Sequence, residues 1–363
     1  MSPADRLMAV LEAASEATLA PALLQPADIF VELAGEEFRK RLFVTDGVDG
    51  ATLCLRPDFT IPVCLEHLAT AHEAPTAYAY RGKIFRRRRA VGEPEFEQAG
   101  TEWIGHADEM ATDARLFALA MACADAVELT PAVRVGDANI FGALTAALGL
   151  SATWRERLST AFGDETRLAA ALNRLALRDQ PDGIAARLAP ALAHVDGRQA
   201  RAIVDAMIGL PPQVPAGGRT SDDIAARILE LATGTGRDAA TVDVIARYLE
   251  VSAPLDRAAD ALTAFARAEG LELDAAIALF AARVEAMVAL GLNTSAVTFD
   301  ARFGRRIGYY TGFVFEMLDP DRPGAEVIAG GRYDKLIALL DPKKSLPAVG
   351  FSVWLDRIPG AAR

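Results

Sequence analysis

The chain has 363 residues, of which 52% are hydrophobic and 24% charged, a composition typical of a globular protein rather than a disordered one. Its net charge of −11 argues against a nucleic-acid partner, because such proteins normally need a basic face that neutralises phosphates. We find no long apolar run for a membrane span and no basic, apolar start for a signal peptide, so we expect no membrane partner and a cytoplasmic location.

The first 130 residues or so mix helix and strand patterns. Apolar spacing predicts a helix within Pro3–Leu24, and a short strand, Leu53–Leu55, precedes a proline. Two longer strand candidates, Tyr78–Arg87 and Phe96–Ile104, flank a Gly-Glu-Pro turn and predict a hairpin. Asp108 then precedes a run of apolar residues at helical spacing, which predicts a helix.

The middle of the chain has a different composition. From about Gly142 to Leu292 it is rich in Ala, Leu and Arg and poor in strand formers. Proline and glycine breaks at 210–212 and 215–218 separate the apolar runs. This pattern predicts an all-helical segment.

Strand patterns return near residue 293. Val297–Asp300, Tyr309–Met317 and Val349–Val353 are predicted strands, and a short helix is expected after the last one. The sequence at 329–331, Ala-Gly-Gly, predicts a tight turn before a helix at Tyr333–Leu340.

These elements indicate an α+β fold with two parts. Residues 1–141 and 293–363 are expected to build one antiparallel sheet flanked by helices, and residues 142–292 to form a helical insertion between its halves.

One face of the strand Phe96–Ile104 carries Gln98, Gly100 and Glu102, because side chains alternate along a strand. An amide and a carboxylate on either side of a glycine could form the polar floor for a flat ligand. Taken alone, the pattern favours a solvent-exposed face with an edge glycine.

Asp58 and Thr60 follow Pro57, whose ring fixes the local backbone. A carboxylate and a hydroxyl at a strand end could hold an ammonium group. The simpler alternative is that either residue caps the helix predicted for the following apolar run.

Two further patterns have both a structural and a functional explanation. Tyr310, Gly312, Val314 and Glu316 would share a strand face, either as a site or as core with one bonded tyrosine hydroxyl. The four consecutive arginines at 86–89 indicate either a solvated hairpin or an anion site.

The cysteines and histidines give no sign of a metal site. Cys54, Cys64 and Cys123 form no Cys-x-x-Cys pair, and the four histidines form no His-x-x-x-His pair. We therefore expect buried thiols, no disulfide, no bound metal and no cofactor.

Together, four blocks resemble the class II aminoacyl-tRNA synthetases, and the histidyl enzyme in particular. Phe85-Arg86 and Gln98–Glu102 resemble the second motif of the class. Gly330–Asp334, Pro347–Phe351 and Asp356-Arg357 resemble the approach to its third motif and that motif itself, and Tyr309-Tyr310 resembles the histidine-specific signature. The blocks occur in the order of that family and cover roughly half of the chain.

The resemblance implies a role for eight residues. Asp58, Thr60 and Gln98 would bind the ammonium of an amino acid, and Glu102 and Tyr310 an imidazole. Three arginines would fall where the synthetase holds ATP or activates the carboxylate, namely Arg86, Arg305 and Arg357.

The chain also departs from the synthetase pattern. Arg88 replaces a glutamate that contacts adenine, Glu93 and Glu95 replace basic residues of the hairpin, and Gly308 replaces an aspartate. Trp354 replaces a small residue, and an indole there would fill the space of a base or ribose. The sequence ends six residues after Arg357, without the anticodon-binding domain of the synthetase.

A synthetase core with a damaged nucleotide site resembles the regulatory subunits of ATP phosphoribosyltransferase. The sequence Arg-Pro-Asp-Phe-Thr at 56–60 is also more similar to these subunits than to the synthetases. This resemblance implies a non-catalytic subunit, without catalytic residues, that activates a short catalytic subunit and helps to transmit feedback inhibition by histidine. It also implies a homodimer within a hetero-oligomer. The alternatives are a truncated synthetase paralogue that activates an amino acid with ATP and a tRNA-binding module, which the acidic charge disfavours.

Overall fold

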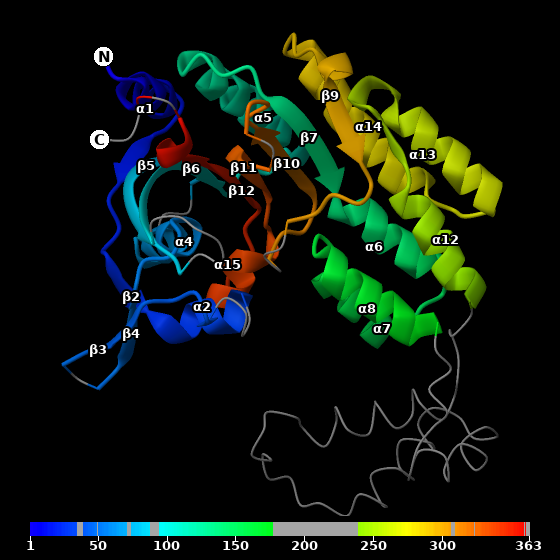
Figure 1. Cartoon of the computed structure of the whole chain (residues 1–363), viewed down its shortest axis with the longest axis horizontal. Helices are drawn as coiled ribbons and strands as arrows, with labels where there is room; N and C mark the ends of the chain where they lie inside the picture. The colour runs from blue at the N-terminus through cyan, green and yellow to red at the C-terminus, as the bar shows by residue number, and fades with distance from the viewer. Residues whose placement is uncertain are drawn as a thin grey trace, which may run out of the picture.

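The computed structural model describes residues 1–34, 39–48, 50–70, 74–87, 94–176, 239–305, 309–322, 324–358 and 360. These residues form a large mixed sheet, a small sheet and the helices that pack against them (Figure 1). Within these residues, no helix is both long enough and apolar enough to cross a membrane.

The large sheet has nine strands in the order β1-β5-β6-β12-β11-β10-β7-β9-β8. All neighbours are antiparallel except the pairs β1–β5 and β7–β9. Because β6 lies beside β12, both ends of the chain contribute to one sheet, as predicted, but this sheet is mixed rather than purely antiparallel. The bounds of its strands are β1 Ala17–Leu19, β5 Thr76–Phe85, β6 Glu95–Ile104, β12 Ala348–Trp354, β11 Glu326–Arg332, β10 Phe313–Leu318, β7 Ala132–Asp137, β9 Val297–Asp300 and β8 Ser252–Pro254.

The small sheet has three antiparallel strands in the order β2-β4-β3 and projects from the blue end of the molecule (Figure 1). The predicted strand Leu53–Leu55 is its central strand. The bounds are β2 Leu24–Pro26, β3 Val44–Asp46 and β4 Thr52–Leu55.

Eleven α-helices surround the two sheets among the described residues. They are α1 Pro3–Ala13, α2 Ala27–Ala34, α4 Thr60–Ala69, α5 Glu109–Ala126, α6 Ala138–Ala147, α7 Ala152–Ala161, α8 Glu165–Ala176, α12 Ala239–Leu249, α13 Leu255–Glu269, α14 Asp274–Ala289 and α15 Lys335–Leu340. There are two 3₁₀ turns among the described residues. One, η1 Thr294–Ala296, precedes β9, and the other, η2 Leu355–Arg357, follows β12.

The predicted hairpin is formed by β5 and β6, which pair from Thr76 opposite Ile104 to Phe85 opposite Glu95. Asp108 caps α5, as expected, by accepting a hydrogen bond from the Ala111 amide. Alternation along β6 places its residues in two different apolar cores. Ala99 and Trp103 pack on the α1, α5 and α14 side, whereas Phe96 and Ile104 pack on the α2, α4 and α15 side.

The predicted opening helix is too long. It starts with a capping box between Ser2 and Asp5 but ends at Ala13, and β1 and β2 occupy the rest of the stretch. The Glu16 amide donates to the Ala77 carbonyl at 2.9 Å, and the Glu16 carboxylate accepts from the Ala77 amide at 2.6 Å. Pairing with β5 therefore ends the helical spacing here.

The predicted tight turn at 329–331 is wrong. These residues lie inside β11, and α15 starts at Lys335 rather than at Tyr333. The glycines are needed for close strand packing, because a Cβ on Gly330 would lie 2.1 Å from the Gly350 carbonyl oxygen, and one on Gly331 2.5 Å from that of Phe313.

The middle of the chain is helical where it is described, apart from β8, which pairs with β9 at the sheet edge. α14 is tied to the core, since the Arg283 guanidinium bonds the Asp113 and Asp137 carboxylates. The boundaries at 141 and 293 remain a prediction. The breaks at 210–212 and 215–218 lie outside the described residues.

Candidate ligand-binding site

Gln98, Gly100 and Glu102 lie on one face of β6, the face toward α4 and α15, as predicted. All three are buried, so the solvent-exposed alternative is wrong. Cross-strand partners in antiparallel strands share a face. The residues of β5 and β12 that lie beside them on this floor are Tyr78, Tyr80, Gly82, Gly350, Ser352 and Trp354.

Glu102 is 1% exposed, and its carboxylate accepts hydrogen bonds from three hydroxyl groups. Thr60 donates to Oε1 over 2.7 Å, Tyr80 to the same oxygen over 3.3 Å, and Tyr333 to Oε2. Burial raises the pKa of Glu102 to about 8, and the charge of Asp58 adds to this, although the three hydroxyls oppose it. The Glu102 side chain can thus act as a hydrogen-bond acceptor, and its carboxyl group can release a proton near neutral pH.

A glycine makes room for this carboxylate. Gly350 of β12 is the cross-strand partner of Glu102, and a Cβ at this position would lie 1.7 Å from Glu102 Oε2. The absence of a side chain at 350 therefore leaves the space that the Glu102 carboxylate occupies.

Asp58 and Thr60 lie at the start of α4 and face the site. The cap position of α4 is Phe59, which makes no side-chain cap bond, and the Thr60 hydroxyl points to Glu102 instead. Asp58 is 5% exposed and accepts from the Ile61 amide at 3.4 Å, so it keeps part of the expected capping role. Burial raises the pKa of Asp58, and the guanidinium of Arg86 opposes this.

Gln98 is fully buried, and neither its amide nitrogen nor its amide oxygen has a hydrogen-bond partner among the described residues. Buried amides are normally paired, because an unpaired buried polar group costs about 1–3 kcal/mol. Such a side chain beside Glu102 on the floor fits a site that receives polar ligand atoms.

Tyr310 joins the site, but not from a strand as predicted. β10 begins at Phe313, so only Val314 and Glu316 of the expected face lie on it, and Gly308 is outside the described residues. The Tyr310 ring lies 6.3 Å from that of Tyr333, the residue that donates to Glu102. Burial raises the pKa of Tyr310, so its phenol stays protonated.

Arg86, Arg305 and Arg357 line one cavity of about 730 Å³ between the sheet and the helices α8 and α12. Arg305 forms an ion pair with Glu326 at 2.8 Å, and Arg357 donates to the Glu326 carbonyl. Burial acts to raise the pKa of Glu326, but the three guanidiniums together lower it. The arginines are thus brought together, with a carboxylate that offsets part of their charge.

Trp354 is 3% exposed and packs in the core on the α4 side. The Arg357 guanidinium lies 5.0 Å from the centre of its indole ring, a cation–π distance. The Arg357 guanidinium therefore lies over an aromatic side chain of the protein itself.

The hairpin between β5 and β6 differs in sequence from that of the synthetases. Of the residues concerned, Arg88, Arg89 and Glu93 lie outside the described residues. Glu95 is described and forms an ion pair with Lys83 across the hairpin. Its charge is thus balanced locally, which weakens the expected repulsion of phosphates.

Three residues of the site were not predicted from the sequence, namely Tyr80, Tyr333 and Glu326. The Tyr80 hydroxyl could have been found from the alternation of β5, since it lies opposite Gly100. Tyr333 stands inside a quoted motif, but a helix was expected to begin there. Glu326 carried no sequence signal. Across the described part of the chain, no cluster of His, Cys, Asp and Glu side chains could hold a metal ion.

The family model of histidyl-tRNA synthetase matches residues 4–217 and 218–358. Curated relatives named ATP phosphoribosyltransferase regulatory subunit, from Brucella ovis and Brucella abortus, are 40% identical over 345 residues. The matches cover 94% of this chain and 92% and 91% of those relatives.

Two solved structures are similar in fold. One is an ATP phosphoribosyltransferase regulatory subunit/histidyl-tRNA synthetase from Bacillus halodurans, with a TM-score of 0.62 at 21% identity. The match covers 99% of this chain and 78% of that protein's chain. The other, a histidyl-tRNA synthetase from Nostoc, has a TM-score of 0.63 at 15% identity and covers 98% and 72%.

Proposed function

Because the chain belongs to the family of ATP phosphoribosyltransferase regulatory subunits, we propose that it binds the short catalytic subunit, activates it and helps to transmit histidine inhibition. The reaction joins ATP to phosphoribosyl pyrophosphate at the first step of histidine biosynthesis. The chain is the non-catalytic, regulatory partner in this complex.

The pairing of Arg357 with Trp354 is the observation that carries the non-catalytic part of this proposal. An arginine that holds a nucleotide base needs a free guanidinium surface, and here the guanidinium lies over an indole of the protein, which reduces that surface. Arg86 and Arg305 line the cavity, but Glu326 offsets part of their charge. These contacts favour a regulatory subunit over a synthetase paralogue that activates an amino acid.

Histidine-dependent exchange between ATP and pyrophosphate tests this choice. We expect no exchange above the background without protein, with an authentic histidyl-tRNA synthetase as the positive control. Exchange at a rate near that of the control would contradict the proposal and favour the synthetase alternative.

The proposed ligand of the pocket is histidine. Asp58, Thr60 and Gln98 would receive its ammonium, and Glu102 and Tyr310 its imidazole. The unpartnered amide of Gln98 and the buried carboxylate of Glu102 support this, because both are polar groups at which a cationic amino acid gains hydrogen bonds.

Regulation then requires that this chain bind the active and inhibited states of its partner with different affinities. A ligand or subunit shifts an equilibrium only through such a difference. A coupling of about 1–3 kcal/mol would change activity or inhibitor affinity several-fold to a hundred-fold. We further propose a homodimer within the hetero-oligomer, a cytoplasmic location and no nucleic-acid partner, in keeping with the net charge of −11.

A further inference from the structure

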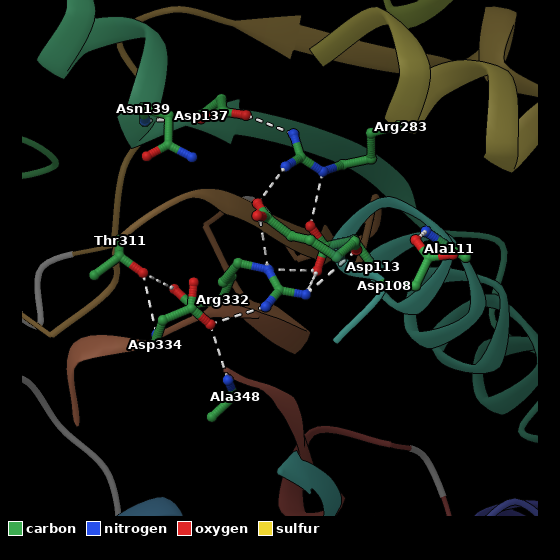
Figure 2. Close-up of polar contacts among 11 residues, drawn as sticks. Asp108, Ala111, Asp113, Asp137, Asn139, Arg283, Thr311, Arg332, Asp334 and Ala348 are labelled. Carbon is green, nitrogen blue, oxygen red and sulfur yellow. Dashed lines mark hydrogen bonds and ion pairs between the residues drawn. The ribbon is translucent and has the colours of Figure 1, made fainter. Parts of the chain in front are cut away.

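Asp113 lies in α5, has no exposed surface and joins two arginines from distant parts of the chain (Figure 2). Its Oδ2 accepts from Arg283 Nε at 2.7 Å, and its Oδ1 from Arg332 Nη2 at 2.6 Å and Nε at 2.9 Å. One buried carboxylate thus binds α14 through one oxygen and the end of β11 through the other.

The Arg283 arm leads to the helices. Arg283 Nη1 donates to Asp137 Oδ2 at 2.7 Å, and Asp137 Oδ1 accepts from the Asn139 amide at 2.8 Å, which caps α6. This arm ties α14 to the junction of β7 and α6. Arg283 Nη2 also donates to Glu109 Oε1 at 3.1 Å, and the Glu109 carbonyl accepts from Arg332 Nη2 at 3.3 Å, so the start of α5 contacts both arginines.

The Arg332 arm leads to the pocket side. Arg332 Nη1 donates to Asp334 Oδ1 at 2.8 Å, and the same oxygen accepts from the Ala348 amide at 2.8 Å. The Asp334 amide donates to the Thr311 hydroxyl at 3.1 Å, as Figure 2 shows. This arm therefore fixes the corner between β11 and α15 to the start of β12 and to the turn before β10.

Tyr333 stands between Arg332 and Asp334 in this corner, is 1% exposed and donates its hydroxyl to Glu102. Its backbone has little freedom, because its amide donates to the Ala348 carbonyl at 2.8 Å and β11 packs closely at Gly331. The direction of the phenol thus depends on the corner that Asp113 and Arg332 hold.

A buried ion network is a weak way to gain stability, since apolar residues of similar size often serve equally well. Its advantage is a fixed geometry, here two guanidinium planes set by one carboxylate. We propose that Asp113 is a positioning residue for the pocket, which acts through Arg332 to hold Tyr333 against Glu102. The inference deepens the proposed histidine pocket and rests on it for its biological meaning.

The test follows the titration of Glu102 itself and needs no ligand. The carboxyl carbon of Glu102, labelled with ¹³C and assigned by its loss in Glu102→Gln, is titrated by NMR in the full-length chain. Tyr333→Phe removes a hydrogen bond that lowers the pKa of this carboxyl, so the pKa should rise by about 1–2 units.

Asp113→Asn should raise the pKa of Glu102 in the same direction as Tyr333→Phe. In the double variant, the pKa of Glu102 should be no higher than in Tyr333→Phe alone, because both changes remove the same contact. Arg332→Lys, which keeps the charge but loses the planar fork, should give a smaller shift of the same sign and decides the matter if Asp113→Asn does not fold.

Asp137→Asn is the matched control, because it removes a bond of Arg283 and none of the hydrogen bonds that Arg332 makes. It should lower the free energy of unfolding without moving the pKa of Glu102. A Glu102 pKa that stays at its wild-type value in both Asp113→Asn and Arg332→Lys, or that moves equally in Asp137→Asn, would overturn the proposal. A wild-type chain that binds no histidine would count against the pocket's ligand alone, since the shifts are measured without it.

Discussion

At the residue scale, the pocket is built around one buried carboxylate. Glu102 is held by the hydroxyls of Thr60, Tyr80 and Tyr333, and it lies in space that Gly350 leaves open. Burial keeps its pKa near 8, so a ligand that brings a positive charge or a hydrogen-bond donor can draw out its proton. Such a group can both accept from an imidazole and release a proton on binding.

Replacing Glu102 by glutamine should therefore weaken histidine binding. Loss of a buried charged contact costs about 2–5 kcal/mol, which corresponds to a fall in affinity of about thirty-fold or more. Titration calorimetry measures this at pH 8.5, above the pKa of the carboxyl, where wild-type Glu102 is mostly charged.

Glu97→Gln is the matched control for this variant. Glu97 lies on the opposite face of the same strand and pairs with Arg81 at 2.9 Å, so its change should leave binding unaltered. Equal affinity in Glu102→Gln and the wild type would mean that histidine is bound elsewhere.

The sequence predicted Gln98, Glu102 and Thr60 as site residues but not the contacts that Glu102 makes. The alternation of β6 identified Gln98 and Glu102, because a side chain's face depends only on its position in the strand. The partners of Glu102 come from α4, β5 and the corner after β11, and such long-range contacts leave no local pattern. This is why Tyr80 and Tyr333 were missed.

At the element scale, the site depends on close pairing of the central strands. β6, β12 and β11 lie side by side, and glycines at 350, 330 and 331 let their backbones and the Glu102 carboxylate approach closely. The hairpin of β5 and β6 was predicted from turn residues and strand formers that are adjacent in sequence. The glycine pair was mistaken for a turn, because close approach to a distant strand cannot be seen locally.

A methyl group at Gly350 should disturb both the sheet and the site. In Gly350→Ala, the new Cβ would lie 1.7 Å from Glu102 Oε2, so the carboxylate must move. Overpacking of this kind costs about 1–3 kcal/mol, and we expect that loss in denaturant unfolding together with weakened histidine binding.

Gly142→Ala is the control for this substitution. Gly142 lies in α6 with nothing within 4 Å of the added Cβ, so alanine should stabilise the helix by up to about 1 kcal/mol. Equal stability and binding in Gly350→Ala and the wild type would contradict the arrangement of β12 and β6.

At the scale of the whole molecule, the fold joins a pocket in the sheet to helices from the middle of the chain. The Arg283 bonds to Asp113 and Asp137 hold α14 against the core, and the cavity lined by Arg305 lies against α8 and α12. The sequence predicted a helical middle from composition, but not that α14 would pack on the core. That contact joins Phe280 and Arg283 of α14 to residues far away in the chain, and such pairs leave no local pattern.

The proposed homodimer should form through the N-terminal region. Its small sheet exposes Leu24 and Val44, and the turn after β3 exposes Val48, as expected for a surface that is covered in an assembly. Sedimentation at micromolar concentration should show a dimer, and Val44→Asp with Val48→Asp should shift it to monomer.

Leu279→Asp, an exposed position on α14, should leave the dimer intact and is the control. A wild-type chain that sediments only as a monomer would count against this assembly.

The most direct test of the regulatory role is a kinetic titration of this chain into a short ATP phosphoribosyltransferase catalytic subunit, with and without histidine. Complex formation is measured in parallel by co-elution. Turnover should rise several-fold and saturate at the stoichiometry of the complex, and the sensitivity to histidine should appear or change as the complex forms. Rates and histidine inhibition that stay the same throughout, although the complex has formed, would contradict the account.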